Sequence, residues 1–532
     1  MATVGQYLIG ALEALGVEHV FGIPGVHNLE LYRGLPRSRI RHVTGRHEQG
    51  LGFMADGYAR LSGRPGVCFT ITGPGLTNIA TAMGQAYCDS IPMLVISSHT
   101  RRGEGASGRG FLHELPGQAA IAREVAGFAQ VVADPCDLPE ALARAFTGFA
   151  SRRPRPAYIE IPRDVLAVDA TGLELPAGDW RHPAAPAPRA AVGAAAVVLK
   201  AASRPVVLAG GGAIGAAAEL RSLAERLEAP VVMTSNGRGI LPPGHPLAVP
   251  FSPSLAAVRA LIADADATLA VGTELGPTDY DFYTDHPLPT PAGLVRIDID
   301  AGQVLRNAIP AVGLSGDARA TLQALAACEL GAPRPGSGPA RAAEARRGAE
   351  DALTAPTRRQ IEFLEAIRDA VPGAALVGDS TQAVYAGILG FAAATPGSWF
   401  NSAMGFGALG YALPAATGAS LAAPERPIVA IIGDGGLQFC LGELGVPRDV
   451  DAWLALVIWN NRGYREIRSS MLAAQLEPSG VEVAPPDFRL LAEAYGYAHC
   501  RIDGLPKLKR ALAGFAARRQ VLVLEVDGDV FE

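Results

Sequence analysis

The sequence predicts an α/β protein built from three doubly wound, parallel-sheet domains. Short, continuous apolar segments that suit buried strands alternate with helical stretches along the whole chain, which is the pattern of parallel sheets. Two stretches rich in Pro, Ala and Gly, read as surface linkers, interrupt it near 168–190 and 329–357. The length of 532 residues also corresponds to roughly three domains. The predicted domains are 1–167, 190–328 and 358–532, and the first and third could share a fold.

The composition and charge of the chain argue against several classes of protein. The net charge is −6, and charged residues make up 18% of the chain without a long basic run, which argues against nucleic acid as a partner. The amino terminus has no basic region followed by a continuous apolar core, and no apolar stretch has membrane-spanning length. The six cysteines are dispersed without a C-x-x-C pair, as in proteins of a reducing compartment. We therefore expect a cytoplasmic protein with no membrane partner.

The first domain contains two strand-like segments, GVCFTITG (66–73) and PMLVISS (92–98), on either side of a helical stretch at 75–90. Gly73 and Pro74 form a turn where the first of these strands ends, and such a composition suits turns of many kinds.

Three polar residues of this domain are candidates for function. Glu48 stands at the start of a helix in RHEQGLGFMADGYAR, where the helix dipole favours an acidic residue even without a function. His27 and His113 lie in the strings GIPGVHNLELYRGL and GRGFLHELPGQ. An isolated histidine such as His113 is as compatible with a structural role as with proton transfer.

The middle domain opens with RPVVLAGGGAIG, in which Gly210, Gly212 and Gly215 fit the G-x-G-x-x-G pattern between a strand and a helix. The pattern supports a competing hypothesis, an oxidoreductase that uses a nicotinamide or flavin dinucleotide. Such a site needs an acidic residue about 20 positions later, at the end of the next strand. That strand ends in Met-Thr-Ser at 233–235, so a tight structural turn is the favoured interpretation.

The third domain carries the most informative pair of residues. The buried strand-like segments PIVAII (427–432) and LALVIW (454–459) are followed by Asp434 and Asn461. The two residues are 27 positions apart, which suits a strand–helix–strand unit that brings both to one sheet edge, where ligands bind. Carboxylate and carboxamide oxygens suit magnesium shared with a phosphate.

Glycines and hydroxyl residues surround this pair. Gly435 and Gly436 leave backbone N–H groups open to phosphate oxygens, and a helix from Leu437 onward would add its positive end. Ser380-Thr381-Gln382 follow another strand, and the glycines of 405–410 precede an apolar helix. Taken singly, these features are equally typical of tight turns and close helix packing.

Together these segments resemble the thiamine-diphosphate-dependent enzymes of the acetolactate synthase and pyruvate decarboxylase superfamily. The strings that carry the resemblance are IVAIIGDGGLQFC with LALVIWNNRGY, HEQGLGFMADGYAR, WFNSAMGFGALGYALP and VGDSTQAVY. The resemblance implies a pyrimidine-binding, a central and a diphosphate-binding domain, and Mg²⁺ held by Asp434, Asn461 and the Gly463 carbonyl. It also implies a set of cofactor-binding residues: Glu48, Gly73, Pro74, Ser380, Thr381, Gln382, Gly407, Leu409, Gly433, Asp434, Gly435, Gly436, Asn461, Gly463 and Tyr464.

The implied catalytic residues are Glu48, His113 and His27. The cofactor's reactive carbon is a weak acid that the cofactor's own amine deprotonates only as the imino tautomer. A carboxylate on the opposite ring nitrogen favours that tautomer, so Glu48 is the implied proton relay. His113 falls where acetolactate synthases carry glutamine and pyruvate decarboxylases a histidine. His27 neighbours the cofactor loop, but Val26 stands where pyruvate decarboxylases carry aspartate.

The strings GIPGVHNLELYRGL, FLHELPGQ, VGTELGPTDYDFY and VIWNNRGYREIR resemble a narrower group, the 5-guanidino-2-oxopentanoate decarboxylases. This resemblance implies non-oxidative decarboxylation of a 2-oxo acid to carbon dioxide and an aldehyde. A cationic substrate tail needs a carboxylate partner, and Asp279, Asp281 and Glu466, with Glu274, are the candidates. Acidic loop residues are usually only solvated, which is the alternative for each of them.

Other functions stay open at this point. An acetolactate-synthase-like carboligase uses the same cofactor, and the dinucleotide-dependent oxidoreductase belongs to another class. A catalytically silent protein is disfavoured because Glu48, Leu409, Asp434 and Asn461 are all present. In the family, Glu48 and the diphosphate site come from different subunits. The resemblance therefore implies a homodimer or homotetramer with active sites at the dimer interface.

Overall fold

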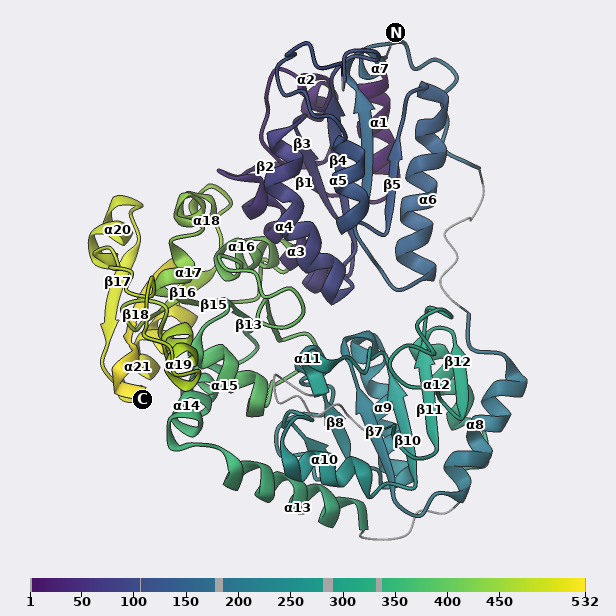
Figure 1. The fold of residues 1–532 in the computed structure, drawn as a ribbon, viewed down its shortest axis with the longest axis vertical. Coiled ribbons are helices and arrows are strands. Elements are labelled where there is room, and N and C mark those ends of the chain that lie inside the picture. The colour runs from purple at the N-terminus through teal and green to yellow at the C-terminus, as the bar shows by residue number, and fades with distance from the viewer. Residues whose placement is uncertain (1, 106, 178–184, 281–289, 332–336, 532) are drawn as a thin grey trace.

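The computed structural model describes residues 2–105, 107–177, 185–280, 290–331 and 337–531. Figure 1 shows three domains, each formed around one sheet. Each sheet has six strands, and all pairings between these strands are parallel. The predicted fold class, α/β with three parallel-sheet domains, is therefore confirmed.

The first and third sheets have the same topology. The first runs in the order β2 (Arg41–Thr44), β1 (His19–Gly22), β3 (Gly66–Thr70), β4 (Met93–His99), β6 (Ala157–Pro162) and β5 (Phe128–Val131). The third runs in the order β14 (Trp399–Asn401), β13 (Ala375–Gly378), β15 (Ile428–Gly433), β16 (Leu454–Asn460), β18 (Val521–Asp527) and β17 (Ala498–Ile502). Numbered within each domain, both orders are the same, as expected for two domains that share a fold.

Helices follow the strands in the same alternation. The first domain contains α1 (Val4–Ala14), α2 (Leu29–Tyr32), α3 (Glu48–Ser62), α4 (Pro74–Asp89), α5 (Gln118–Val125), α6 (Leu138–Ser151) and α7 (Arg163–Leu166). The third contains α14 (Ala355–Ala370), α15 (Gln382–Gly390), α16 (Ala412–Ala422), α17 (Asp434–Leu437), α18 (Val446–Asp449), α19 (Arg465–Ala473), α20 (Phe488–Ala494) and α21 (Leu505–Ala516).

Helices α3 and α16 join the first and third domains at a close crossing (Figure 1). A Cβ atom at Gly57 would overlap the carbonyl oxygen of Ala415, and one at Gly418 would overlap the carbonyl oxygen of Met54. Glycine at both positions lets the two backbones touch. Residues of both helices belong to one hydrophobic core, so the two domains pack as one body around this crossing.

The central sheet has a different topology. Its order is β12 (Val312–Ser315), β11 (Leu294–Asp298), β10 (Ala267–Val271), β7 (Pro205–Ala209), β8 (Val231–Met233) and β9 (Ala248–Val249). Read within the domain, this is the strand order of dinucleotide-binding folds. The helices of this part of the chain are α8 (Arg189–Ala201), α9 (Ala217–Leu227), α10 (Ala256–Ala263), α11 (Pro277–Tyr280), α12 (Ala318–Ala326) and α13 (Ser337–Ala352).

The stretch predicted as the second linker contains helix α13, so the interpretation of 329–357 as a surface linker is wrong for that part. Alanine favours helices, and Ala342, Ala345 and Ala349 recur at helical spacing and are buried against the central domain. In the described part of the chain, no helix combines the length and apolar character needed to cross a membrane.

Candidate active site

Asp434 and Asn461 lie side by side at the carboxyl edge of the third sheet. They follow the neighbouring parallel strands β15 and β16, as the sequence predicts. Both side chains are buried, with 1% and 5% exposure. The Asp434 carboxylate accepts a hydrogen bond from the Gly463 N–H at 2.9 Å, and burial raises the pKa of this carboxyl.

Three oxygen atoms converge between these residues. The Asn461 side-chain nitrogen donates to Gln382 Oε1 at 2.8 Å, which turns Asn461 Oδ1 to within 3.1 Å of Asp434 Oδ1 and 2.9 Å of the Gly463 carbonyl oxygen. Neighbouring oxygens of an octahedral ion with 2.0–2.1 Å bonds lie about 2.9 Å apart. The spacing therefore fits Mg²⁺, although no group of three or more His, Cys, Asp or Glu side chains in the described ranges could hold a metal.

Asn461 Oδ1 thus faces two acceptor oxygens, an arrangement that suits a bound cation rather than a hydrogen bond.

A cavity of about 210 Å³ opens beside these oxygens. All the cofactor-binding residues predicted in the third domain line it, and so does Glu466. Its lining is Ser380, Thr381, Gln382, Tyr385, Gly407, Leu409, Gly433, Asp434, Gly435, Gly436, Asn461, Gly463, Tyr464, Arg465, Glu466 and Ile467. The buried Ser380 hydroxyl has no hydrogen-bond partner among the described residues, which leaves it for a bound group.

One local prediction at this cavity is wrong. The helix expected from Leu437 onward is instead the single turn α17, which begins at Asp434 and ends at Leu437, followed by a 3₁₀ turn at Leu441–Gly445. Glycines in the following segment disfavour a continued helix. Glu443 in that turn accepts hydrogen bonds from the N–H groups of Arg46 and His47, both at 2.9 Å, and this contact draws the chain toward the first domain.

Asp379 is a buried residue that links two segments of the cavity lining. It was not predicted from the sequence. Its carboxylate accepts hydrogen bonds from the N–H groups of Tyr411 at 2.7 Å, Ser380 at 2.9 Å and Ala412 at 3.0 Å. Burial raises its pKa to about 6, against the effect of these donors. Asp379 thus ties the Ser380 turn to the segment that carries Leu409. The only available indication was a carboxylate directly after a strand.

The predicted pyrimidine-side residues lie together in the first domain. Glu48 is the first residue of α3 and is buried, and its Oε2 accepts a hydrogen bond from Asn78 Nδ2 at 2.9 Å. The rings of His27 and His113 are 5.1 Å apart, and neither buried Nδ1 atom has a partner among the described residues. Burial lowers the pKa of His27. Sequence reasoning missed Asn78, which only the packing of α4 on α3 brings to Glu48.

None of the first-domain residues that the structure describes lines the third-domain cavity of the same chain. Glu48, Gly73, Pro74 and the two histidines therefore form a separate group, and the structure of a single chain does not unite the two halves of the predicted site.

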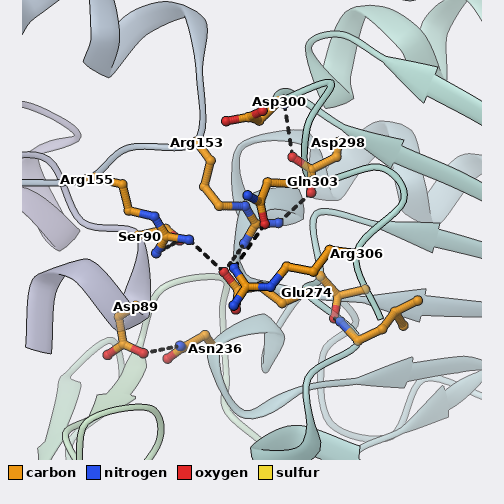
Figure 2. Close-up of polar contacts among 12 residues, drawn as sticks. Asp89, Ser90, Arg153, Arg155, Asn236, Glu274, Asp298, Asp300, Gln303 and Arg306 are labelled. Carbon is orange, nitrogen blue, oxygen red and sulfur yellow. Dashed lines mark hydrogen bonds and ion pairs between the residues drawn. The ribbon is translucent and has the colours of Figure 1, made fainter. Parts of the chain in front are cut away.

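A second cavity, of about 460 Å³, lies where the first, central and third domains meet, and Glu274 and Asp279 are among its lining residues. Figure 2 shows Arg153 and Arg155 reaching Glu274 from the first domain, each at 3.0 Å, with Arg153 also paired to Asp298. Burial and the charges of Asp89 and Glu274 raise the pKa of Asp279 to about 7.

Of the acidic residues suggested for a cationic substrate, Glu466 is the one in the cavity beside Leu409. Glu274 and Asp279 lie in the second cavity, and Asp281 lies outside the described residues.

The central glycine loop is explained by packing. The N–H groups of Gly210 and Gly212 donate to the carbonyl oxygens of Val271 and Gly272, at 2.9 and 3.0 Å. A Cβ atom at Gly210 or Gly212 would collide with the backbone at Gly272. The loop is therefore a tight structural turn, as favoured from the sequence, and these N–H groups are not free for a phosphate.

The fold and this site define an α/β enzyme that holds a diphosphate-bearing cofactor at the edge of its third sheet. Family models described as the N-terminal TPP binding domain, the central domain and the C-terminal TPP binding domain of thiamine pyrophosphate enzymes match residues 2–121, 192–325 and 377–526. The chain belongs to the family of enzymes that depend on thiamine pyrophosphate, which is thiamine diphosphate.

Full-length relatives agree with this family. The chain is 46% identical to a probable 2-ketoarginine decarboxylase of Pseudomonas aeruginosa, over 98% of this chain and 93% of that protein. It is 33% identical to an acetolactate synthase of Mycobacterium bovis, over 94% and 84%, and 30% identical to one of Arthrospira platensis, over 98% and 93%. The resemblance stated from the sequence is confirmed.

Proposed function

We propose that this enzyme decarboxylates 5-guanidino-2-oxopentanoate without oxidation and releases carbon dioxide and an aldehyde, with thiamine diphosphate and Mg²⁺ as cofactors. The observation that carries the proposal is that Glu466 lines the cavity that Leu409 and Asp434 also line. Similarity to a probable 2-ketoarginine decarboxylase supports the same substrate. Dispersed free cysteines and the acidic net charge support a cytoplasmic enzyme without nucleic acid.

Each half of the site has a distinct task in this proposal. Asp434, Asn461 and the Gly463 carbonyl would hold Mg²⁺, and Ser380 and the glycines at 435–436 would bind the diphosphate. The bound cofactor supplies an electron sink for the pair of electrons released with carbon dioxide. Leu409 and the Gly407 carbonyl oxygen, which line the same cavity, would hold the ring portion of the cofactor.

Residues of the first domain transfer protons in this proposal. Glu48 exchanges a proton with the pyrimidine ring nitrogen, and Asn78 orients its carboxylate. His27 and His113 stand as a pair whose unpartnered Nδ1 atoms are available to give a proton to the product carbon.

Glu466 provides a direct test of substrate choice. Its carboxylate has no ion-pair partner in the described part of the chain, so a guanidinium can pair with it. Glu466→Gln should raise the KM for 5-guanidino-2-oxopentanoate by about 10–100-fold, since a charged hydrogen bond contributes about 1.5–3 kcal/mol. The KM for 2-oxohexanoate, which lacks the cation, should change less than about threefold.

The measurement is initial-rate decarboxylation of a panel of 2-oxo acids, with both carbon dioxide and the organic product identified. Glu477→Gln, an exposed glutamate of the same domain, is the matched control. An equal rise of KM for both substrates would contradict the assigned role, and acetolactate from pyruvate would favour the carboligase.

A second prediction concerns assembly, because we infer that the site forms between two copies. Large apolar side chains stay exposed beside the predicted site residues: Val26, Leu29, Leu112, Phe406, Phe439, Ile467, Leu472 and Leu476. Contact with a second copy would bury apolar groups of this kind. Specific activity per chain should therefore fall on dilution in parallel with the dimer fraction measured by mass photometry. Full activity in verified monomer would refute the shared site.

Carboligation is the second candidate function, and the relatives that are acetolactate synthases favour it. The dinucleotide-dependent oxidoreductase is disfavoured because the central glycine loop packs against the backbone at Gly272.

A further inference from the structure

A buried hydrogen-bond network centres on Gln118, the first residue of α5. Its Oε1 accepts from the Gly73 N–H at 2.7 Å, and its Nε2 donates to the Ser98 carbonyl at 3.1 Å and to the Tyr158 hydroxyl at 2.9 Å. The Tyr158 hydroxyl in turn donates to Glu160 Oε2 at 2.8 Å. Gln118, Tyr158 and Glu160 are all at most 3% exposed, so each of these bonds is shielded from water.

The Gly73 end of this network lies next to the segments that support two predicted proton-transfer residues, His113 and Glu48. Gly73 adopts φ 72° and lies so close to His113 that a Cβ atom would be 2.7 Å from its carbonyl oxygen. Gly73 also precedes α4, and Asn78 in the first turns of that helix donates to Glu48. A shift of the Gly73 amide would therefore move the supports of His113 and Glu48 together.

The backbone at His113 makes this support necessary. His113 has φ 64°, a left-handed conformation that costs free energy for a residue with a side chain. Such a conformation persists only where neighbouring groups hold it, and the contact with Gly73 is one of them.

We propose that Gln118 is a positioning residue that fixes the Gly73 turn, and through this turn holds Glu48 and His113 in place for catalysis. The inference rests on the proposed function for the roles of those two residues. A side-chain amide suits the position because one atom accepts from Gly73 while the other donates to Ser98 and Tyr158. Leucine is similar in size but would leave the buried Gly73 N–H without its hydrogen-bond partner.

Gln118→Leu and Tyr158→Phe form a matched pair for the test. Both remove buried hydrogen bonds, and both should lower the Tm by several degrees. Only Gln118→Leu releases the Gly73 N–H. Hydrogen exchange of peptides spanning 72–79 in the cofactor-free protein should be at least tenfold faster in Gln118→Leu, and close to wild type in Tyr158→Phe.

Kinetics then separate positioning from general stability. At saturating cofactor and substrate, Gln118→Leu should lower kcat about 30-fold or more per folded chain, and Tyr158→Phe less than threefold. Gln118→Glu should regain part of the activity as the pH falls, because the protonated carboxyl can accept from Gly73 with one oxygen and donate a single hydrogen bond with the other.

Unchanged exchange at Gly73 in Gln118→Leu, or a kcat within threefold of that of Tyr158→Phe, would overturn the proposal. If the wild type decarboxylates no 2-oxo acid, the proposed function fails instead. Calorimetric titration with thiamine diphosphate and Mg²⁺ then replaces kcat: a weaker affinity in Gln118→Leu than in Tyr158→Phe supports positioning, and equal affinities overturn it.

Discussion

Replacing Glu48 by glutamine is expected to lower kcat by about 10²–10⁴-fold, the usual contribution of a positioned proton-transfer group. The amide keeps the size of the side chain and an oxygen for the hydrogen bond from Asn78, but it cannot exchange a proton with a ring nitrogen. The Tm and the calorimetric affinity for the cofactor should stay near wild type. Steady-state decarboxylation with saturating cofactor measures the loss.

Glu124→Gln is the control for this substitution, since it makes the same chemical change at an exposed position of the first domain. Its kcat should equal that of the wild type. A Glu48→Gln enzyme that turns over within tenfold of wild type would remove Glu48 from the proton path.

Asp434→Asn is expected to weaken the binding of Mg²⁺ with thiamine diphosphate by about 100-fold or more. Even groups that only orient a metal ligand contribute 10–100-fold to metal affinity. The substitution would also remove the single negative charge among the three converging oxygens. The buried Gly463 N–H also loses a charged acceptor. Isothermal titration with the cofactor and Mg²⁺, and the dependence of activity on Mg²⁺ concentration, measure the change.

Asp503→Asn, at an exposed carboxylate of the same domain, should bind the cofactor like the wild type. Wild-type affinity in Asp434→Asn would show that the metal lies elsewhere. Removing Mg²⁺ with a chelator should reproduce the Asp434→Asn phenotype in the unmodified enzyme.

The sequence predicted the parts of the fold that local pattern determines. Buried strands at 428–433 and 454–460 are continuous apolar runs, so they and the residues that follow them, Asp434 and Asn461, could be assigned directly. The parallel arrangement then placed both residues at one edge. All third-domain cofactor residues named from the resemblance line one cavity for the same reason.

The residues that support the site could not be predicted, because their partners are distant in the sequence. Asp379 binds the backbone at 410–412, Asn78 meets Glu48, and Gln118 reaches Gly73. Each pairing depends on how two helices or loops pack, which no local pattern specifies. The helix at 337–352 was misjudged because alanine suits both linkers and packed helices.

The contacts at the crossing of α3 and α16 follow a twofold relation of the kind that relates two identical subunits. Gly57 of α3 faces Ala415 of α16, and Gly418 of α16 faces Met54 of α3. Ala415 lies three positions before Gly418, and Met54 lies three positions before Gly57, so the two contacts are equivalent. Such reciprocal contact defines the interface of a twofold homodimer. Two domains of equal topology are therefore joined in one chain through a local twofold relation between α3 and α16. The same relation matches Glu48, the first residue of α3, with Leu409, which lies shortly before α16.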